Sequence, residues 1–192
     1  MKKTLSILMT IAALSFSSVA FAQKPVKGSV TGEVQLNFQT GTAAIGVVAP
    51  SLNFRYFLMD DLALRLKLAI TSTKDKTGDV EDKTSNFSFA PGIEKHFKGT
   101  DKLSPYIGAE IPISGGKVEH KTAAGSSTDK TSSFGVNLIF GGDYYVWQSV
   151  YVGAEVAWGF SSGTSTPEVG EKTTTSGFSL GANSGIRLGM KF

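Results

Sequence analysis

In the stretch LALRLKLAI, residues 62–70, large aliphatic side chains occupy every second position. Arg65 and Lys67 lie between them, together with two alanines. Successive side chains of a β-strand point to opposite faces, so the alternation predicts a strand with one apolar face and one cationic face. Such a strand needs an apolar phase on one side and counter-charges on the other.

The same two-residue period recurs along the chain and defines eight segments. They cover approximately residues 30–38, 45–58, 62–70, 86–94, 106–113, 134–143, 150–160 and 178–192. The connections after the second, fourth and sixth segments are short, at 59–61, 98–104 and 147–149. Those after the third, fifth and seventh are long and polar, at 72–85, 115–132 and 161–174, whereas the connection at 40–44 is brief. Short turns on one rim and long loops on the other indicate an all-β, antiparallel, up-and-down barrel of eight strands.

The first residues have the features of a secretory signal peptide. Lys2 and Lys3 precede an apolar run at 5–21 that closes on Ala20-Phe21-Ala22. We therefore expect residues 1–22 to be cleaved and residues 23–192 to form the barrel. Without the two lysines, 17 basic residues face 16 acidic ones, which argues against nucleic acid as a partner. The chain has no cysteine, so disulfides and thiolate metal sites are excluded.

Alternation alone suits a membrane barrel and also a soluble barrel of the lipocalin type, whose apolar face points inward. The interior of an eight-stranded barrel is just wide enough for its own side chains or one small ligand. Leu, Ile, Phe and Trp on nearly every segment exceed that volume, so we expect them to face lipid. The opposite face is rich in glycine, which suits a narrow lumen; these residues are Gly92, Gly108, Gly135, Gly141, Gly153, Gly159, Gly181, Gly185 and Gly189.

The charges on the polar face balance, five acidic against five basic. An unpaired charge in a confined lumen is costly, whereas ion pairs with additional hydrogen bonds are tolerated. The pattern therefore predicts a lumen charge network made of Glu33, Arg55, Arg65, Lys67, Glu94, Glu110, Asp143, Glu155, Arg187 and Lys191.

Aromatic residues gather near the two predicted rims, as expected for girdles at the two membrane interfaces. Near the short-turn rim are Tyr56, Phe57, Phe97, Tyr144, Tyr145, Trp147 and Phe192. Near the long-loop rim are Phe38, Phe87, Phe134, Trp158, Phe160 and Phe178.

The chain ends in GIRLGMKF, with apolar residues at alternate positions up to the terminal Phe192. In this ending, in the number of segments and in their pattern, the chain resembles the small eight-stranded bacterial outer-membrane barrels of the outer-membrane protein A and X type. The resemblance covers essentially the whole mature chain. It implies a place in a Gram-negative outer membrane, with both termini periplasmic and the long loops outside. It also implies that Phe192 is the assembly signal read by the barrel-assembly machinery.

The sequence contains no phosphate-binding glycine loop, nucleophile elbow or paired-histidine zinc motif, and we predict no cofactor. A lipid-modifying enzyme of this architecture would need a His with a Ser and a carboxylate at the outer rim. His96 lies near a short turn at the other rim, and the sequence shows no partner for His120 in its long loop.

We therefore predict a non-enzymatic outer-membrane barrel that contributes to envelope integrity or interacts through its external loops. Its predicted partners are outer-membrane lipid and a surface ligand that the sequence does not identify. The alternatives are a narrow channel for ions or small solutes, a lipid-modifying enzyme, and a soluble periplasmic ligand-binding barrel.

Overall fold

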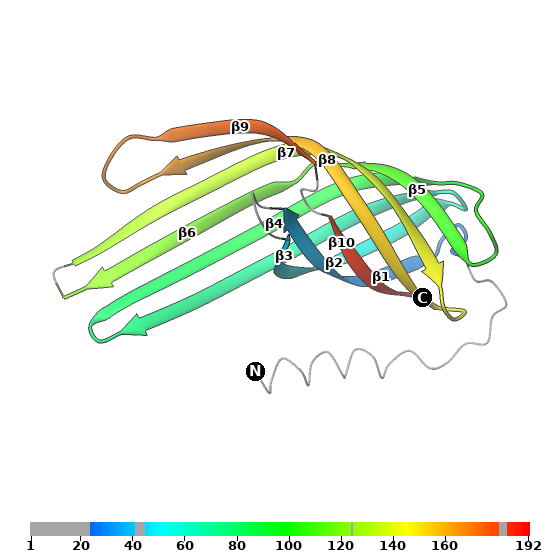
Figure 1. Ribbon diagram of the computed structural model, residues 1–192, viewed down its shortest axis with the longest axis horizontal. Coiled ribbons are helices and arrows are strands. Elements are labelled where there is room, and N and C mark those ends of the chain that lie inside the picture. Colours follow the sequence, from blue (N-terminus) through cyan, green and yellow to red (C-terminus); the bar gives the residue numbers. More distant parts are fainter. Residues whose placement is uncertain (1–23, 41–44, 124, 181–183) are drawn as a thin grey trace.

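The computed structural model describes residues 24–40, 45–123, 125–180 and 184–192. Within these ranges ten strands form one antiparallel sheet that curls into a barrel (Figure 1). The strands are β1 (Val30–Thr40), β2 (Ile45–Met59), β3 (Leu62–Thr77), β4 (Val80–His96), β5 (Leu103–Glu110), β6 (Ile113–Thr122), β7 (Gly125–Tyr145), β8 (Val150–Thr166), β9 (Thr173–Leu180) and β10 (Ser184–Lys191).

These ten strands make a ring of eight, because two barrel strands are each interrupted once. β5 and β6 both pair with β4 and β7, and they are separated at Ile111 and Pro112. β9 and β10 both pair with β8. β1 closes the ring against β10, in a register from Thr31↔Lys191 to Phe38↔Ser184. The predicted eight-stranded antiparallel up-and-down barrel is confirmed.

The two faces of the barrel wall are as the alternation predicts. Large apolar side chains point outward, and Leu64, Leu138 and Leu188 are 46%, 45% and 60% exposed. Charged side chains point inward, and Arg55 and Arg187 are only 2% and 1% exposed. Because a soluble barrel would show the reverse, the lipocalin-type alternative is wrong.

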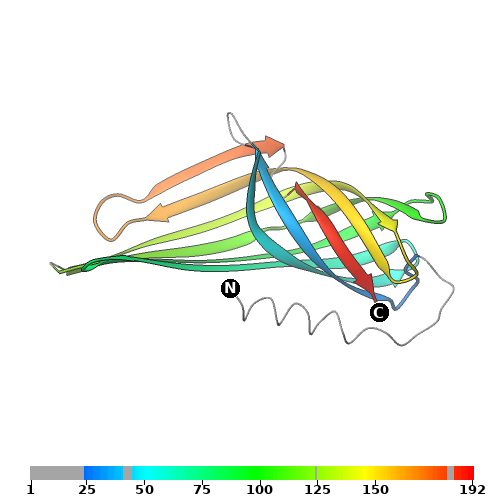
Figure 2. The same cartoon turned by 60° about the horizontal axis from the view of Figure 1, so that its bottom comes forward.

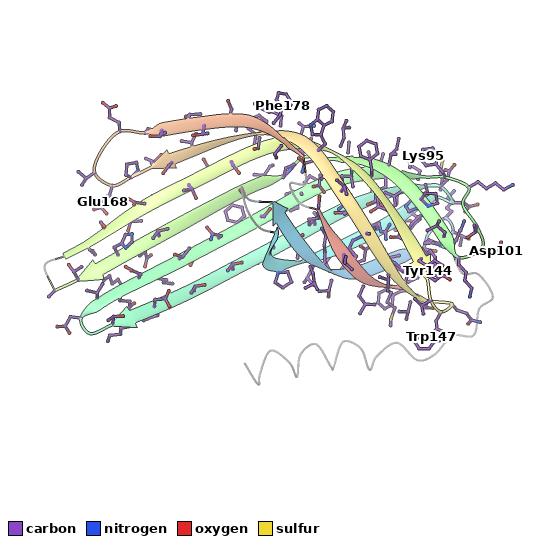
Figure 3. All side chains as sticks on the ribbon, in the orientation of Figure 1. Lys95, Asp101, Tyr144, Trp147, Glu168 and Phe178 are labelled. Atoms are coloured by element: carbon purple, nitrogen blue, oxygen red, sulfur yellow. The ribbon has the colours of Figure 1, made fainter. Side chains whose placement is uncertain are left out.

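Two aromatic residues of the predicted short-turn girdle lie inside the barrel instead. Phe57 and Tyr145 are each 1% exposed, whereas their neighbours Tyr56 and Tyr144 are 48% and 49% exposed. Adjacent strand residues point to opposite faces, so only one residue of each pair can belong to an outer girdle. Tyr144 and Trp147 lie at the short-turn end, and Phe178 lies far from it (Figure 3).

Most of the polar segments predicted as long loops are strands. The β3–β4 pairing continues to Thr77↔Val80, and the β6–β7 pairing continues to Thr122↔Gly125. The β8–β9 pairing continues to Ser165↔Thr173. Both faces of these extensions are polar, so they lack the apolar period by which a strand is recognised in sequence. Three long hairpins therefore project beyond the barrel (Figures 1 and 2).

The projecting hairpins form an open sheet, which we call the projecting sheet and define as residues 71–86, 114–133 and 161–177. The β2–β3 pairing stops at Leu52↔Leu68, so the part of β3 beyond this pair has no strand on that side among the described residues. At the opposite edge, β9 pairs with β8 alone in the described part of the chain. The projecting sheet thus has two free edges, in contrast to the closed barrel below it.

Both ends of the described chain lie at the short-turn end of the barrel. Near the N-terminal end, the amide of Gly28 donates to the carbonyl of Phe57 at 2.8 Å, and Pro25 is buried. The amide of the C-terminal Phe192 donates to the carbonyl of Val30 at 2.9 Å. Among the residues that the structure describes, no helix is long and apolar enough to cross a membrane.

Candidate functional site: the charged lumen

Arg55 of β2 joins carboxylates from three other strands. Its guanidinium lies 2.5 Å from Glu33, 2.8 Å from Asp143 and 3.0 Å from Glu94. The side chains of all four residues are almost completely buried. Since a buried charge is tolerated only with close counter-charges, Arg55 and these acids depend on each other.

Arg187 of β10, on the other side of β1 from Arg55, contacts two of the same carboxylates. Its guanidinium lies 2.6 Å from Asp143, 3.0 Å from Glu33 and 3.6 Å from Glu155. Two arginines therefore share two carboxylates, which ties β1, β2, β7 and β10 together across the barrel.

Arg65 and Lys67 of β3 complete the network toward the projecting sheet. Arg65 lies 2.7 Å from Glu94, 3.1 Å from Glu155 and 3.3 Å from Glu110. The ammonium of Lys67 lies 2.9 Å from Glu155. The two cations of the LALRLKLAI stretch thus meet the counter-charges that its alternation requires.

Four uncharged or weakly basic side chains take part in the network although they were not among the predicted site residues. Tyr151 donates to Glu33 at 2.7 Å, and Tyr106 donates to Glu155 at 3.0 Å. The amide of Asn137 donates to Glu110 at 3.0 Å, and His96 Nε2 lies 3.3 Å from Glu94. The period-two pattern could have found them, since each lies on the polar face of its segment.

The structure brings nine of the ten predicted lumen residues together and places the tenth, Lys191, at the rim. The ammonium of Lys191 donates to the carbonyl of Lys24 at 3.4 Å. Phe192, the predicted assembly signal, is 67% exposed at the same end. Lys191 differs from the other nine residues because it is the last residue of β10 and lies where the lumen opens.

Glycines on the inner face make room for the large side chains of the network. A Cβ atom at Gly189 would lie 2.2 Å from the ring of Tyr151, and one at Gly141 would lie 2.3 Å from the hydroxyl of Tyr106. The two tyrosines can therefore lie across the lumen only because the facing strand positions carry no side chain. Of the predicted lumen glycines, Gly181 falls outside the described residues.

The network separates two cavities in the barrel. One, of about 280 Å³, lies at the short-turn end beside Pro25, Phe57 and His96. The other, of about 180 Å³, lies toward the projecting sheet and is lined in part by Asn137 and Ser161. Between them Arg55, Arg187 and Tyr106 are at most 2% exposed, so the charged side chains fill the lumen at this level.

His120 has a partner, contrary to the sequence-based expectation. Its Nδ1 lies 2.7 Å from Asp82 Oδ1, and Ser127 lies opposite His120 in the β6–β7 register. The partner was missed because it comes from β4, about forty residues away, through a hairpin predicted as loop. No hydrogen bond among the described residues joins Ser127 to His120. In the part of the chain that the structure describes, no three His, Asp or Glu side chains lie close enough together to hold a metal ion.

The sequence profile of the OmpA-OmpF-like porin family matches residues 77–192, more than half of the chain. The chain belongs to this family. Solved structures of small outer-membrane barrels share its fold. The outer-membrane protein OprG from Pseudomonas aeruginosa is 14% identical, with a TM-score of 0.53 over 90% of this chain and 99% of OprG. Neisserial surface protein A is 16% identical, with a TM-score of 0.50 over 85% of this chain and 96% of that protein.

At these identities the structural likeness shows the fold alone. No curated protein has a matching sequence. The family match and the shared fold together make the chain an outer-membrane β-barrel, as its lipid-facing apolar surface requires.

Proposed function

We propose that this protein is a non-enzymatic outer-membrane barrel that holds the projecting sheet at the cell surface for interaction with other macromolecules. The observation that carries the proposal is the combination of a filled lumen with an open sheet outside the barrel. A lumen filled with ion pairs stabilises the barrel and leaves little room for solutes to pass through it. A sheet with free edges, in contrast, offers unpaired backbone donors and acceptors to another chain.

The β9 edge is the better docking edge of the two. Charged side chains and proline protect an edge strand from pairing with another chain. The sequence of β9, TTTSGFSL, has neither. The free part of β3 carries Lys74, Asp75 and Lys76, and these charges disfavour an added strand. An extended segment of a partner would therefore add to β9, with main-chain hydrogen bonds supplying the affinity.

Complementation of a strain that lacks the protein tests the proposal. The strain would carry the intact protein, or a trimmed variant in which residues 73–84, 116–131 and 163–175 are replaced by two-residue turns. We expect the intact protein to restore cell–cell aggregation and retention on a surface coated with extracellular-matrix protein, and the trimmed variant to fail in both. Equal attachment by the trimmed variant would contradict the proposal. Resistance to detergent, measured in parallel, reports any separate contribution of the barrel to envelope integrity.

A matched pair of lysine substitutions tests the β9 edge itself. Ser176 of β9 and Ser162 of β8 are cross-strand partners on the same face of the sheet. Ser176→Lys places a charge on the free edge, whereas Ser162→Lys places the same charge on a strand that is paired on both sides. Loss of attachment with Ser176→Lys alone is the expected result; equal effects would point to general surface charge instead.

A narrow channel is the second candidate, favoured by the porin family match and by the cavities on either side of the network. The ion pair with Glu110 is the longest of the three that Arg65 forms. Movement of Arg65 away from Glu110 would open a path through the charged network that fills the lumen between the two cavities. Planar-bilayer conductance of refolded protein, with a heat-modifiability gel as proof of folding, separates the two functions. Discrete steps that change with Glu110→Gln would favour the channel, and silence would favour surface interaction.

A further inference from the structure

The two faces of the projecting sheet carry different charges. The outer face continues the lipid-facing surface of the barrel, and the strand registers place six lysines and two glutamates on it. These are Lys74, Lys76, Lys83, Lys117, Lys121 and Lys130 with Glu81 and Glu119. The inner face carries Asp75, Asp82, Asp129 and His120. Positive charge therefore collects on the face that continues the lipid-facing surface of the barrel.

Lys117 and Lys130 stand directly opposite each other on β6 and β7. Like charges at facing positions of an antiparallel pair destabilise it. Lys117 forms an ion pair with Glu119, but no ion pair joins Lys130 to a carboxylate among the described residues. An anion between the two ammonium groups would remove the repulsion.

An apolar hollow lies beside this lysine pair on the outer face. Its volume is about 820 Å³, and its lining includes Ile70, Phe87 and Ile113 as well as both lysines. The hollow exists because Gly115 carries no side chain: a Cβ there would lie 2.5 Å from the ring of Phe87, which covers the glycine. The site thus combines an apolar floor with a cationic rim.

The hollow lies where the outer face changes from apolar to polar. In one cross-strand row Ile70 faces Phe87, and in the next row Ser72 faces Ser85, which in turn faces Lys117. Ile70 and Phe87 are 84% and 54% exposed, as expected for lipid-facing residues. With the projecting sheet at the cell surface, as the proposed function has it, the change lies at the outer interface of the membrane.

From this arrangement we propose that Lys117, Lys130 and the hollow beneath them bind a phosphorylated lipid of the outer leaflet. The phosphate lies between the two ammonium groups, which act as point charges. An acyl chain lies over Phe87, Gly115 and Ile113. The lipid orients the projecting sheet at the membrane surface and offsets the repulsion between the lysines.

Lipid titration of the full-length protein, refolded in a nonionic detergent, tests this proposal. The probe is a fluorescent glycolipid with two phosphates. Its binding is measured as the quenching of the probe fluorescence by the protein, for the intact protein and for two double variants. Lys117→Gln with Lys130→Gln should weaken binding by roughly tenfold or more, since each lysine near an anionic lipid surface contributes on the order of 1 kcal/mol. Lys76→Gln with Lys121→Gln removes the same charge from the same face near the hairpin tips and should leave binding unchanged. Equal losses in both variants, or no loss in either, would overturn the proposal.

Two further arms separate the lipid from other anions. Inorganic pyrophosphate should fail to displace the glycolipid at equal concentration, because it lacks the acyl chain; equal competition would mean a soluble-phosphate site and would overturn the lipid assignment. Ser132→Phe fills the hollow without changing charge and should also weaken binding. A heat-modifiability gel shows that each variant is folded.

Discussion

The buried carboxylates of the lumen differ in how many partners each one has. Glu155 contacts Arg65, Lys67 and Arg187 and accepts a hydrogen bond from Tyr106. Glu110 contacts one cation, Arg65, at 3.3 Å. The two acids look alike in sequence, since both stand in a Gly-Ala-Glu motif, but their removal should have unequal consequences.

We expect Glu155→Ala to lower the free energy of unfolding by about 3–5 kcal/mol, because it leaves buried cations without their shared counter-charge. Glu110→Ala should cost less. The measurement is the urea midpoint of the refolded protein in detergent. Asp61→Ala serves as the control, because Asp61 and Lys95 form an ion pair in which both side chains are about half exposed, and such pairs contribute at most about 1 kcal/mol. An unchanged midpoint with Glu155→Ala would contradict the assigned role.

Outside the membrane, a lysine partner controls the titration of Glu81. A hydrogen bond from Lys74, at 2.8 Å, lowers the pKa of the Glu81 carboxyl below its ordinary value. The contact is therefore present at neutral pH and is lost as the pH falls through the lowered pKa. Lys74→Met should raise the pKa of Glu81 in a carbon-detected NMR titration, while the pKa of Glu119, which is lowered by Lys117, should stay low. A Glu81 titration that does not respond to the substitution would contradict this cause.

At the scale of the strand, glycine positions decide where bulky lumen side chains can lie. Tyr151 crosses the lumen over Gly189 and holds both Glu33 and Arg55. A side chain at Gly189 must displace the ring and with it these hydrogen bonds. In contrast, a Cβ at Gly177 of β9 would meet no atom within 4 Å.

Gly189→Val should therefore reduce the folded fraction on a heat-modifiability gel, since overpacking alone costs about 1–3 kcal/mol and the lost hydrogen bonds add to it. Gly177→Val is the matched control, with the same change of volume in a strand that has open space. Equal folding of the two variants would show that the tyrosine can move aside at little cost.

At the scale of the whole molecule, the barrel and the projecting sheet are stabilised by different interactions. The ion pairs of the lumen join residues of the barrel strands only. The projecting hairpins pair with one another, in registers that continue those of the barrel.

We therefore expect the variant trimmed at residues 73–84, 116–131 and 163–175 to refold into a heat-modifiable barrel. Its urea midpoint should lie close to that of the intact protein, because the closed ladder and the lumen network remain. A trimmed variant that cannot fold would mean that the projecting sheet is needed to assemble the barrel.

Alternation along the chain was enough to predict the barrel, its strand number and the outward direction of its apolar face. In a strictly alternating strand, all large apolar side chains lie on one face and all charged side chains lie on the other. Because the lumen of an eight-stranded barrel is too narrow for the large apolar side chains, that face must point outward. The same alternation predicted most of the charged residues of the lumen, because the position of a residue in the alternating pattern shows whether its side chain points inward or outward.

The identity of the charges that meet depends on the folded barrel, because ion pairs such as Arg187 with Glu33 join strands far apart in the chain. The folded structure was therefore needed to assign these pairs. It also showed that the polar connections are strands, since hairpins with water on both faces have no apolar period to mark them. For the same reason it alone brought Asp82 to His120 and Lys117 to Lys130. Register is a property of two paired strands, and it cannot be read from either strand alone.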